Sequence, residues 1–359
     1  MSTSFHLLAT VSAHGFGHFA QTALVLSELR RQSPEVRITL RTRLPEALVK
    51  SRIADDVTVL HEVADFGMEM TSALDVDYPA SAQRYREFHR HWAEQVTQEA
   101  QRLRALKPDL VLANAPYLTL AGARQANIPA VGLCSLNWAD IYQDYFIDTP
   151  GARDIHRQIV DAYNAAQIFF KPEPSMAMPD FTNGVSVPPL AQLGTPSRAL
   201  LNQHWQLDAE EKLVFLVPGG ISTDIPVEQW PRIEGVRWIT SWAHRSTRRD
   251  LLSHADCPLS FTDLLASCDA VVTKPGYGTT TEAVCNGRPV LFVKRGDWAE
   301  EPFIVDWLRR HGQALEITRE QFFTGDLRAS LLQLWALPRP AIPSAQGARS
   351  IVEQMQQFF

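Results

Sequence analysis

Short apolar runs alternate with longer segments of helical pattern along most of the chain. The apolar runs are rich in Val, Ile, Leu and Phe, which is typical of strands that are buried on both faces. Alternation of such strands with helical segments is typical of βαβ units. The pattern therefore predicts an α/β protein with parallel sheets that are covered by helices on both sides.

This rhythm occurs twice, so we expect one architecture used in both halves of the chain. In the first half, the predicted strands are 5–11, 36–41, 109–113 and 130–134, and the predicted helices are 20–31, 80–106 and 117–126. In the second half, the predicted strands are 212–217, 236–240, 270–273 and 289–293, and the predicted helices are 262–266, 279–286 and 347–358.

A proline-rich stretch separates the two halves. Its prolines are Pro172, Pro174, Pro179, Pro188, Pro189 and Pro196. Prolines at this density stiffen a connection and break regular elements, so we expect the linker between two domains here. We predict a first domain at 1–185 and a second at 186–342, followed by a terminal helical segment at 343–359.

Composition supports two globular domains and narrows the possible partners. The chain has 359 residues, of which 45% are hydrophobic and 21% are charged, and its net charge is −6. Each half can bury its own core. A broad basic surface is not indicated, so we expect no nucleic-acid partner. The four cysteines are far apart in the sequence, which argues against a disulfide framework or a zinc site. The N-terminus lacks a signal-peptide pattern and the chain lacks a long apolar run, so we expect a cytoplasmic protein without a transmembrane segment.

A first glycine-bearing loop follows the first predicted strand and contains His14, Gly15, Gly17 and His18. It does not complete the dinucleotide fingerprint, because Ala20 occupies the place of the third glycine. A histidine at the start of a helix tends to stay neutral, and a neutral imidazole can act as a general base. The alternative is a structural histidine that binds the loop backbone, and these residues alone leave both readings open.

A second glycine-bearing loop, 274–282, follows a predicted strand and opens a helix. Gly276 and Gly278 allow close approach to a ligand, and the hydroxyls and amides of residues 279–281 are suited to a diphosphate. The carboxylate of Glu282 can accept hydrogen bonds from ribose. Alternatively, Glu282 is the capping-box partner of Thr279, at the required spacing of three residues.

A third segment, 219–223, begins with Gly219 and Gly220 directly after the first predicted strand of the second half. Its amides and hydroxyls are suited to the same phosphates, and a plain turn is the alternative. In the first half, Asp75 and Asp77 form a D-x-D sequence, which in other proteins can bind a metal and a nucleotide, but they lie far from the phosphate loop. We therefore expect no metal site and no cofactor.

Together, these loops resemble those of the GT-B glycosyltransferases, including the MurG-like enzymes and the plant UDP-glycosyltransferases. Residues 274–283 and 295–303, together with Asn137, Trp138, Ile141 and Tyr142, are similar to a narrower group. That group is the glycosyltransferase-like N-terminal region of plant L-arabinokinases and its stand-alone bacterial relatives. The resemblance covers nearly the whole chain, from about residue 7 to 358.

The resemblance implies two Rossmann-like domains that face a cleft, with the acceptor bound by the N-terminal domain and the donor by the C-terminal one. It implies a terminal helix that packs back on the N-terminal domain, and a nucleotide diphosphate sugar, with a UDP-sugar as the expected donor. The catalytic group implied is His18, with His14 and Asn114 beside it. The implied donor-binding residues are Gly17, Gly219, Gly220, Phe261, Gly276, Gly278, Thr279, Thr280, Glu282, Glu300 and Glu301.

One departure from the family concerns Asn114. Plant enzymes support the base histidine with an aspartate at this place, and an amide orients an imidazole without balancing its positive charge. The leading hypothesis is a metal-independent glycosyltransferase with an unknown acceptor. The alternatives are a nucleotide-sugar epimerase and a regulatory module that binds a nucleotide sugar without chemistry.

Overall fold

The computed structural model describes residues 5–12, 16–50, 52–53, 57–62, 64–71, 75–219 and 225–359, with the side chains of His244 and Arg245 left out. These residues form two compact units. Unit 1 holds the described residues up to Thr71, then Asp75–Leu190 and the terminal segment Gln346–Phe359. Unit 2 is Ala191–Ala345. The first boundary lies five residues beyond the position 185/186 expected from the prolines, and the second lies three residues beyond 342/343.

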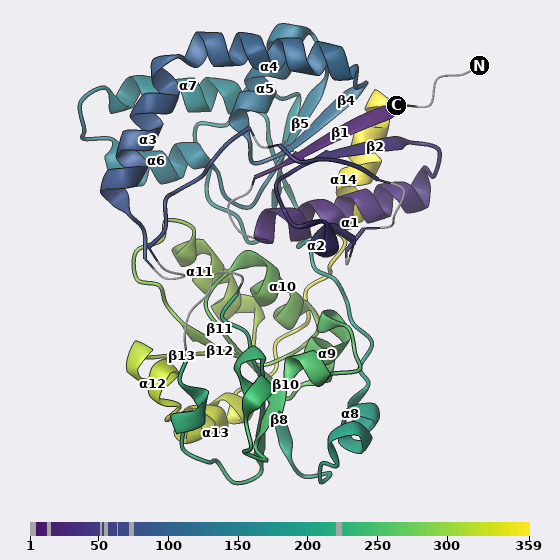
Figure 1. Ribbon diagram of the computed structural model, residues 1–359, viewed down its shortest axis with the longest axis vertical. Coiled ribbons are helices and arrows are strands. Elements are labelled where there is room, and N and C mark those ends of the chain that lie inside the picture. The colour runs from purple at the N-terminus through teal and green to yellow at the C-terminus, as the bar shows by residue number, and fades with distance from the viewer. Residues whose placement is uncertain are drawn as a thin grey trace. The chain divides into compact units, whose positions relative to one another are not determined.

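Unit 1 is built on a parallel sheet in the order β3-β2-β1-β4-β5-β6-β7. Its strands are β1 His6–Val11, β2 Arg37–Arg41, β3 Thr58–Leu60, β4 Leu110–Asn114, β5 Ala130–Leu133, β6 Ile168–Pro172 and β7 Gly184–Val187. Its helices are α1 Gly17–Gln32, α2 Glu46–Lys50, α3 Tyr78–Arg90, α4 Trp92–Leu106, α5 Tyr117–Ala126, α6 Trp138–Phe146, α7 Ala152–Tyr163 and α14 Gly347–Met355. Helices α4, α5 and α7 cover one face of this sheet, and α1 and α14 lie together on the other (Figure 1).

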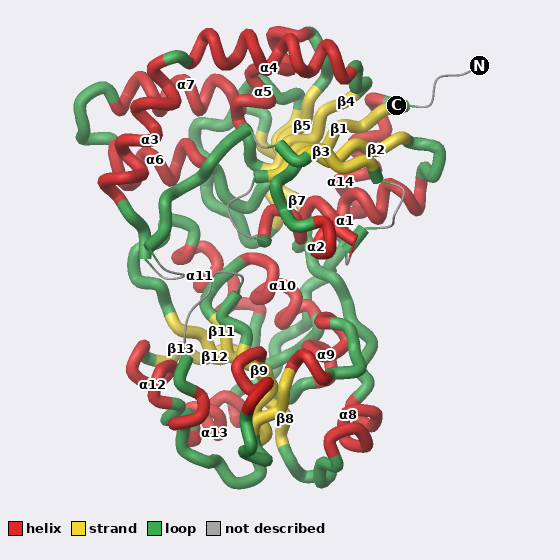
Figure 2. Tube along the Cα trace, in the orientation of Figure 1, coloured by secondary structure: helices red, strands yellow, loops and turns green. Residues whose placement is uncertain are grey.

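Unit 2 repeats the design with the strand order β10-β9-β8-β11-β12-β13, again with parallel pairing throughout. Its strands are β8 Lys212–Leu216, β9 Val236–Thr240, β10 Leu251–Ser253, β11 Ala270–Thr273, β12 Val290–Val293 and β13 Ala314–Ile317. Its α-helices are α8 Arg198–Trp205, α9 Phe261–Ser267, α10 Tyr277–Cys285, α11 Glu301–His311, α12 Arg319–Thr324 and α13 Arg328–Ala336 (Figure 2). Each sheet is thus a Rossmann-like sheet, and the expected α/β class is confirmed.

The eight strands expected from the apolar runs are confirmed to within about two residues at each end. Their side chains are almost all buried, which is why the apolar signal was clear. The proline-rich stretch was wrongly expected to lack regular elements, because β7 lies within it. Residues Gly184–Val187 contain no proline, so their amides are available to pair with β6. The expected helix 80–106 is two helices, α3 and α4, which are separated at His91.

The terminal helix α14 is part of unit 1. Ile351, Val352 and Met355 are fully buried on its inner face. Gly347 lies against the backbone at the end of the first domain, since a Cβ on this residue would lie 2.2 Å from the carbonyl oxygen of Pro188. Only glycine allows this approach, which brings the terminal segment onto the sheet that the first half of the chain forms.

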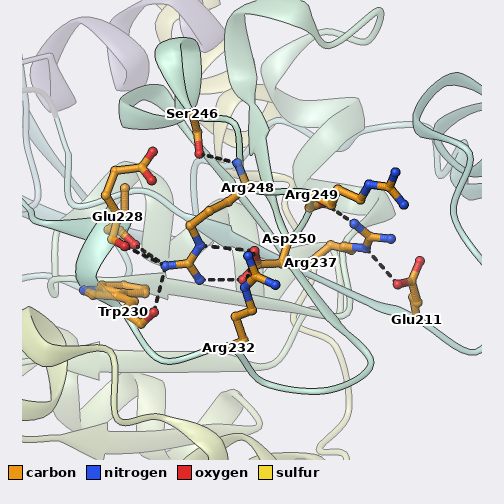
Figure 3. A network of polar contacts seen from close by, with 10 residues as sticks. Glu211, Glu228, Trp230, Arg232, Arg237, Ser246, Arg248, Arg249 and Asp250 are labelled. Atoms are coloured by element: carbon orange, nitrogen blue, oxygen red, sulfur yellow. Dashed lines mark hydrogen bonds and ion pairs between the residues drawn. The ribbon is translucent and has the colours of Figure 1, made fainter.

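Arg248 is the centre of a hydrogen-bond network in unit 2 (Figure 3). Its guanidinium donates two hydrogen bonds to Asp250, at 3.1 and 2.6 Å, and further bonds to the carbonyl oxygens of Val227, Glu228 and Trp230. A neighbouring pair, Arg237 and Glu211, adds a bond of 2.7 Å. These contacts tie the 3-10 helix Val227–Gln229 to the start of β10 and hold the outer part of the sheet. Among the described residues, no helix combines the length and the apolar character needed to cross a bilayer.

Candidate functional site

Each sheet has one point where the strand order reverses, and the glycine loops lie there. In unit 1 this point lies between β1 and β4, and in unit 2 it lies between β8 and β11. Parallel α/β sheets bind ligands at the carboxyl ends of the strands at such a point. Helix α1 is the element that follows β1, and helix α10 is the element that follows β11. Both candidate sites are therefore placed by topology.

His18 is the second residue of α1 and lies at the switch point of unit 1. Its side chain is buried, with an exposed fraction of 5% for the residue. The Nδ1 atom lies 3.1 Å from Oδ1 of Asn114, the last residue of β4. The structure therefore brings together two of the residues that sequence comparison placed in the catalytic group. His14 lies outside the described residues, as does Gly220.

The hydrogen bonds of Asn114 determine the tautomer of His18. The amide nitrogen Nδ2 donates to three acceptors, namely the carbonyl oxygen of His18, Oε1 of Gln21 and Oγ1 of Thr22. The opposite amide orientation would place an oxygen against these oxygens, so Oδ1 must face the imidazole. Oδ1 can only accept, and His18 therefore carries its proton on Nδ1. The lone pair of the ring lies on Nε2, which has no hydrogen-bond partner among the described residues.

His18 is neutral at physiological pH. Burial lowers its pKa from 6.5 to about 4, and the hydrogen bond to Asn114 opposes this only partly. An imidazole with a free Nε2 lone pair is in the protonation state that a general base requires. His18 does not simply bind the loop backbone, because its ring contacts the side chains of Asn114 in β4 and Cys134 after β5.

Two further side chains surround His18 that the sequence analysis did not assign to catalysis. Sγ of Cys134 lies 3.3 Å from Nδ1, and the ring of Trp138 lies 6.0 Å from the imidazole between centroids. Cys134 directly follows β5, which pairs with β4. Its position after a predicted strand could therefore have marked it as a residue of the site. The indole Nε1 of Trp138 donates to Oδ2 of Asp65 at 3.0 Å. Burial raises the pKa of Asp65 to about 6, against opposing effects led by Trp138.

In unit 2, helix α10 begins at Tyr277 with Gly276 as its N-cap. The first-turn amides are therefore those of residues 277–279, two positions before the expected start. The capping-box alternative for Glu282 is wrong, because Thr279 lies inside the helix and no side chain caps its start. A Cβ on Gly276 would approach no atom closer than 3.9 Å, and a Cβ on Gly17 would have no neighbour within 4 Å. Both glycines thus face open space at their switch points.

Lys274 is the residue of this loop that the sequence analysis overlooked, although it precedes the glycines directly. It is buried at the carboxyl end of β11, and its side chain lies against Gly219, where a Cβ would come within 2.9 Å of Cε. Gly219 has a φ of +101°, which other residues adopt only with strain. Burial, together with the nearby charge of Arg295, lowers the pKa of Lys274 to about 7. Lys274, Arg295 and the amides of a helix N-terminus therefore lie at this edge, together with the carboxylate of Glu301, whose charge favours the protonated lysine.

The remaining donor-side candidates lie on the helices around this loop. Thr280 is fully buried in α10, and its hydroxyl has no hydrogen-bond partner among the described residues. Glu282 is buried one turn into the same helix. Phe261 begins α9, and its ring lies 5.5 Å from that of Phe215.

Glu300 and Glu301 are both buried and have different surroundings. Glu301 accepts from the backbone amides of Arg295 and Gly296, at 2.6 and 3.4 Å. Its carboxylate thus holds the loop after β12. Glu300 caps α11 in sequence, and its Oε2 accepts from the indole of Trp298 at 3.3 Å. The two neighbouring carboxylates are not equivalent, and Glu301 has a clear local structural role.

Comparison with known proteins places this geometry in context. No protein-family model matches the chain. L-arabinokinase of Arabidopsis thaliana is 25% identical over 334 residues, which are 90% of this chain and 32% of that protein. The glycosyltransferase of kitacinnamycin matches with a TM-score of 0.62 at 14% identity, over 98% of this chain and 95% of that one. UGT89C1 of Arabidopsis thaliana, solved in complex with UDP, matches with a TM-score of 0.58 at 14% identity, over 98% and 95%. The chain has the GT-B fold.

The likeness to these structures establishes the GT-B fold, and function has to come from the sites. The chain spans about a third of the L-arabinokinase that it matches. In the described part of the chain, no three His, Cys, Asp or Glu side chains gather closely enough to hold a metal ion. Asp77 of the D-x-D sequence caps α3, since its Oδ1 accepts from the amide of Ala80 at 3.0 Å.

Proposed function

We propose that the chain is a glycosyltransferase that moves a sugar from a nucleotide diphosphate sugar, with UDP as the expected nucleotide, to an acceptor hydroxyl or amine. The observation that carries this proposal is the buried, neutral His18, whose Nδ1–H is bonded to Asn114 and whose Nε2 lone pair is free to take a proton. The acceptor would be bound by unit 1, and the donor by the α10 edge of unit 2.

The donor edge supports this assignment through its charge. The leaving group of the reaction is a nucleoside diphosphate, which gains negative charge as the sugar departs. Lys274, Arg295 and the amides at the start of α10 can stabilise that charge in the way a metal ion does in other enzymes. The proposed mechanism accordingly assigns no step to a metal, and Glu282 is the candidate for binding the ribose.

The proposed reaction joins the acceptor held by unit 1 to the sugar of the donor held by unit 2. His18 would then take the proton of the acceptor as its oxygen or nitrogen attacks the anomeric carbon. The C–O bond to the diphosphate breaks, and its electrons leave with the β-phosphate. Removing the base should lower the rate of transfer about 100- to 10,000-fold.

The first test separates donor binding from transfer. UDP and a panel of UDP-sugars are titrated in EDTA by calorimetry, with the wild-type chain and with Glu282→Ala. We expect metal-independent binding that Glu282→Ala weakens. UDP release from the sugar that binds best is then measured with an acceptor panel. His18→Ala should retain donor binding and lose transfer, whereas His91→Ala, which changes an exposed histidine of the same unit, should retain both. Retained transfer in His18→Ala would remove His18 from the mechanism.

A second candidate is a module that binds a nucleotide sugar without catalysis. Asn114 favours it, because an amide cannot balance the charge that His18 acquires as a base. The extent of the match also favours it, since the chain corresponds to only 32% of a protein whose name denotes a kinase. Tight UDP-sugar binding without turnover for any acceptor would support this function. Failure to bind any nucleotide would contradict both candidates.

A further inference from the structure

The indole of Trp138 lies beside the imidazole of His18. The two ring centroids are 6.0 Å apart, and the ring planes are inclined by 56°. Aromatic pairs interact at centroid distances of about 4.5–7 Å, so the two rings pack against each other. Trp138 has no exposed surface, and His18 is also buried. The indole therefore forms one side of the space that the imidazole occupies.

The hydrogen bond to Asn114 fixes only one end of the imidazole. It holds Nδ1 at 3.1 Å from Oδ1, and Sγ of Cys134 lies 3.3 Å from the same ring atom. Both contacts are at Nδ1, so they leave the ring free to turn about this end. Nε2, which would take the proton, lies on the other side of the ring. Its direction depends on a contact that fixes the ring plane, and the indole of Trp138 provides one.

Trp138 is itself held through its side chain and its main chain. Its Nε1 donates to Oδ2 of Asp65 at 3.0 Å, and both residues are buried. Its backbone amide donates to the hydroxyl of Tyr163 at 3.2 Å, and that hydroxyl donates to the carbonyl oxygen of Ala115 at 2.8 Å. Ala115 directly follows β4, whose last residue binds Nδ1 of the candidate base. The indole and the Nδ1 partner are thus connected through the backbone around this site.

The carboxylate of Asp65 is placed by the packing of its neighbour in the chain. Phe66 packs edge-on against Tyr85 of α3, with 4.8 Å between the ring centroids. Tyr85 in turn packs against Tyr142 of α6 at 4.9 Å, and α6 is the helix that begins with Trp138. The segment after β3 is therefore packed, through α3, against the helix that carries the indole.

We propose that Asp65 and Trp138 are positioning residues that fix the ring plane of His18, and with it the direction in which Nε2 meets the acceptor. Burying a carboxylate costs stability, and an apolar side chain would fill this place at a lower cost. The bond between indole and carboxylate has a preferred direction, which apolar packing does not provide. This inference rests on the proposed function, because it concerns the base of that reaction.

The first measurement follows the imidazole itself by NMR and needs no turnover. Histidine is isotope-labelled in the whole chain, and the ring signals of His18 are assigned by their absence in His18→Gln. Asp65→Leu should shift these signals at pH 8, because the indole loses its acceptor and its ring-current effect on the imidazole changes. Asp65→Asn retains an acceptor oxygen, so its His18 signals should stay close to those of the wild type. Asp154→Leu, at an exposed position of unit 1, should leave them unchanged.

The second measurement is steady-state transfer with the donor and acceptor that the wild type uses best. Asp65→Leu should lower kcat about 10- to 100-fold, since displacing a catalytic group by about 1 Å has an effect of this size. The Kd for UDP should not change, because the proposed donor site lies in unit 2. Trp138→Phe keeps an aromatic ring and removes the N–H, so it should lower kcat in the same way.

Unchanged His18 signals in a folded Asp65→Leu chain would overturn the proposal. An equally large shift in Asp65→Asn would overturn it too, because that variant keeps the acceptor. If urea unfolding shows that Asp65→Leu does not fold, Trp138→Phe decides, and a wild-type kcat in this variant contradicts the proposal. If the wild type transfers no sugar, the proposed function fails, while the NMR signals still decide whether Asp65 positions the ring.

Discussion

The exchange of Asn114 for aspartate tests the structure most directly, because sequence comparison and geometry predict opposite results. Comparison with plant enzymes suggests that Asn114→Asp restores a missing carboxylate and improves the base. In the structure, Nδ2 of Asn114 donates to three oxygens, on His18, Gln21 and Thr22. An aspartate would place an oxygen against these three acceptors at a site with no exposure to solvent.

The magnitude follows from these bonds. The amide carries two hydrogens, so about two hydrogen bonds are lost at about 1 kcal/mol each, and burying a new charge against three oxygens adds a further cost. Protonation of His18 can recover part of this, because an opposite charge at that distance raises a histidine pKa by about 1–3. We therefore expect Asn114→Asp to lower the free energy of unfolding of unit 1 by about 3 kcal/mol at pH 8, with less loss at pH 6.

The assay is urea unfolding followed by tryptophan fluorescence, to which unit 1 contributes Trp92 and Trp138. Asn127→Asp is the matched control, since Asn127 is exposed at the end of α5 and should change stability by less than about 1 kcal/mol. A transition of Asn114→Asp within 1 kcal/mol of the wild type would refute the orientation assigned to the amide. The tautomer of His18 would then lose its support as well.

Three further predictions concern single side chains. The pKa of His18 is about 4 in the folded chain and 6.5 in the unfolded chain, so the unfolded state binds protons more tightly between these values. The free energy of unfolding should therefore fall by about 2 kcal/mol through His18 from pH 8 to pH 5. Urea unfolding of His18→Gln should lack this fall. Gly219→Ala should weaken UDP binding about 10-fold in calorimetry, because the new Cβ displaces Lys274, whereas Gly235→Ala, which has a similar positive φ but open space, should not. Arg248→Ala should destabilise unit 2 by about 3 kcal/mol, because it removes the largely buried ion-pair partner of Asp250. The urea midpoint of unit 2 should fall, while the pH dependence that His18 gives to the stability of unit 1 should not change.

The sequence predicted the fold well where burial is uniform. Strands such as β1 and β4 are apolar throughout because helices cover both of their faces, so their pattern is unmistakable. Five strands were missed, and all lie at or next to sheet edges, are partly exposed and are short or interrupted by polar residues, namely β3, β6, β7, β10 and β13. The break between α3 and α4 was also missed, because His91 carries no glycine or proline signal and its backbone is set by tertiary packing.

The candidate sites were predictable only in part. Glycine loops after strands mark a switch point from sequence alone, and they led to His18 and to the α10 loop. Lys274 and Cys134 were missed, since their significance depends on burial and on which strands are neighbours. The same is true of Asp65, which follows a short edge strand and becomes notable only through its bond to Trp138. Local propensity cannot report contacts between residues that lie tens of positions apart.

The charge at the two switch points distinguishes the roles of two otherwise similar units. In unit 1, the groups around His18 are amides, a thiol and an indole, and burial keeps the imidazole neutral. In unit 2, the charge of Arg295 opposes protonation of Lys274 and that of Glu301 favours it, and a bound anion would further favour the charged lysine. A nucleoside diphosphate carries several negative charges, and an acceptor hydroxyl carries none. These charges therefore favour the proposal that unit 2 binds the donor and unit 1 the acceptor.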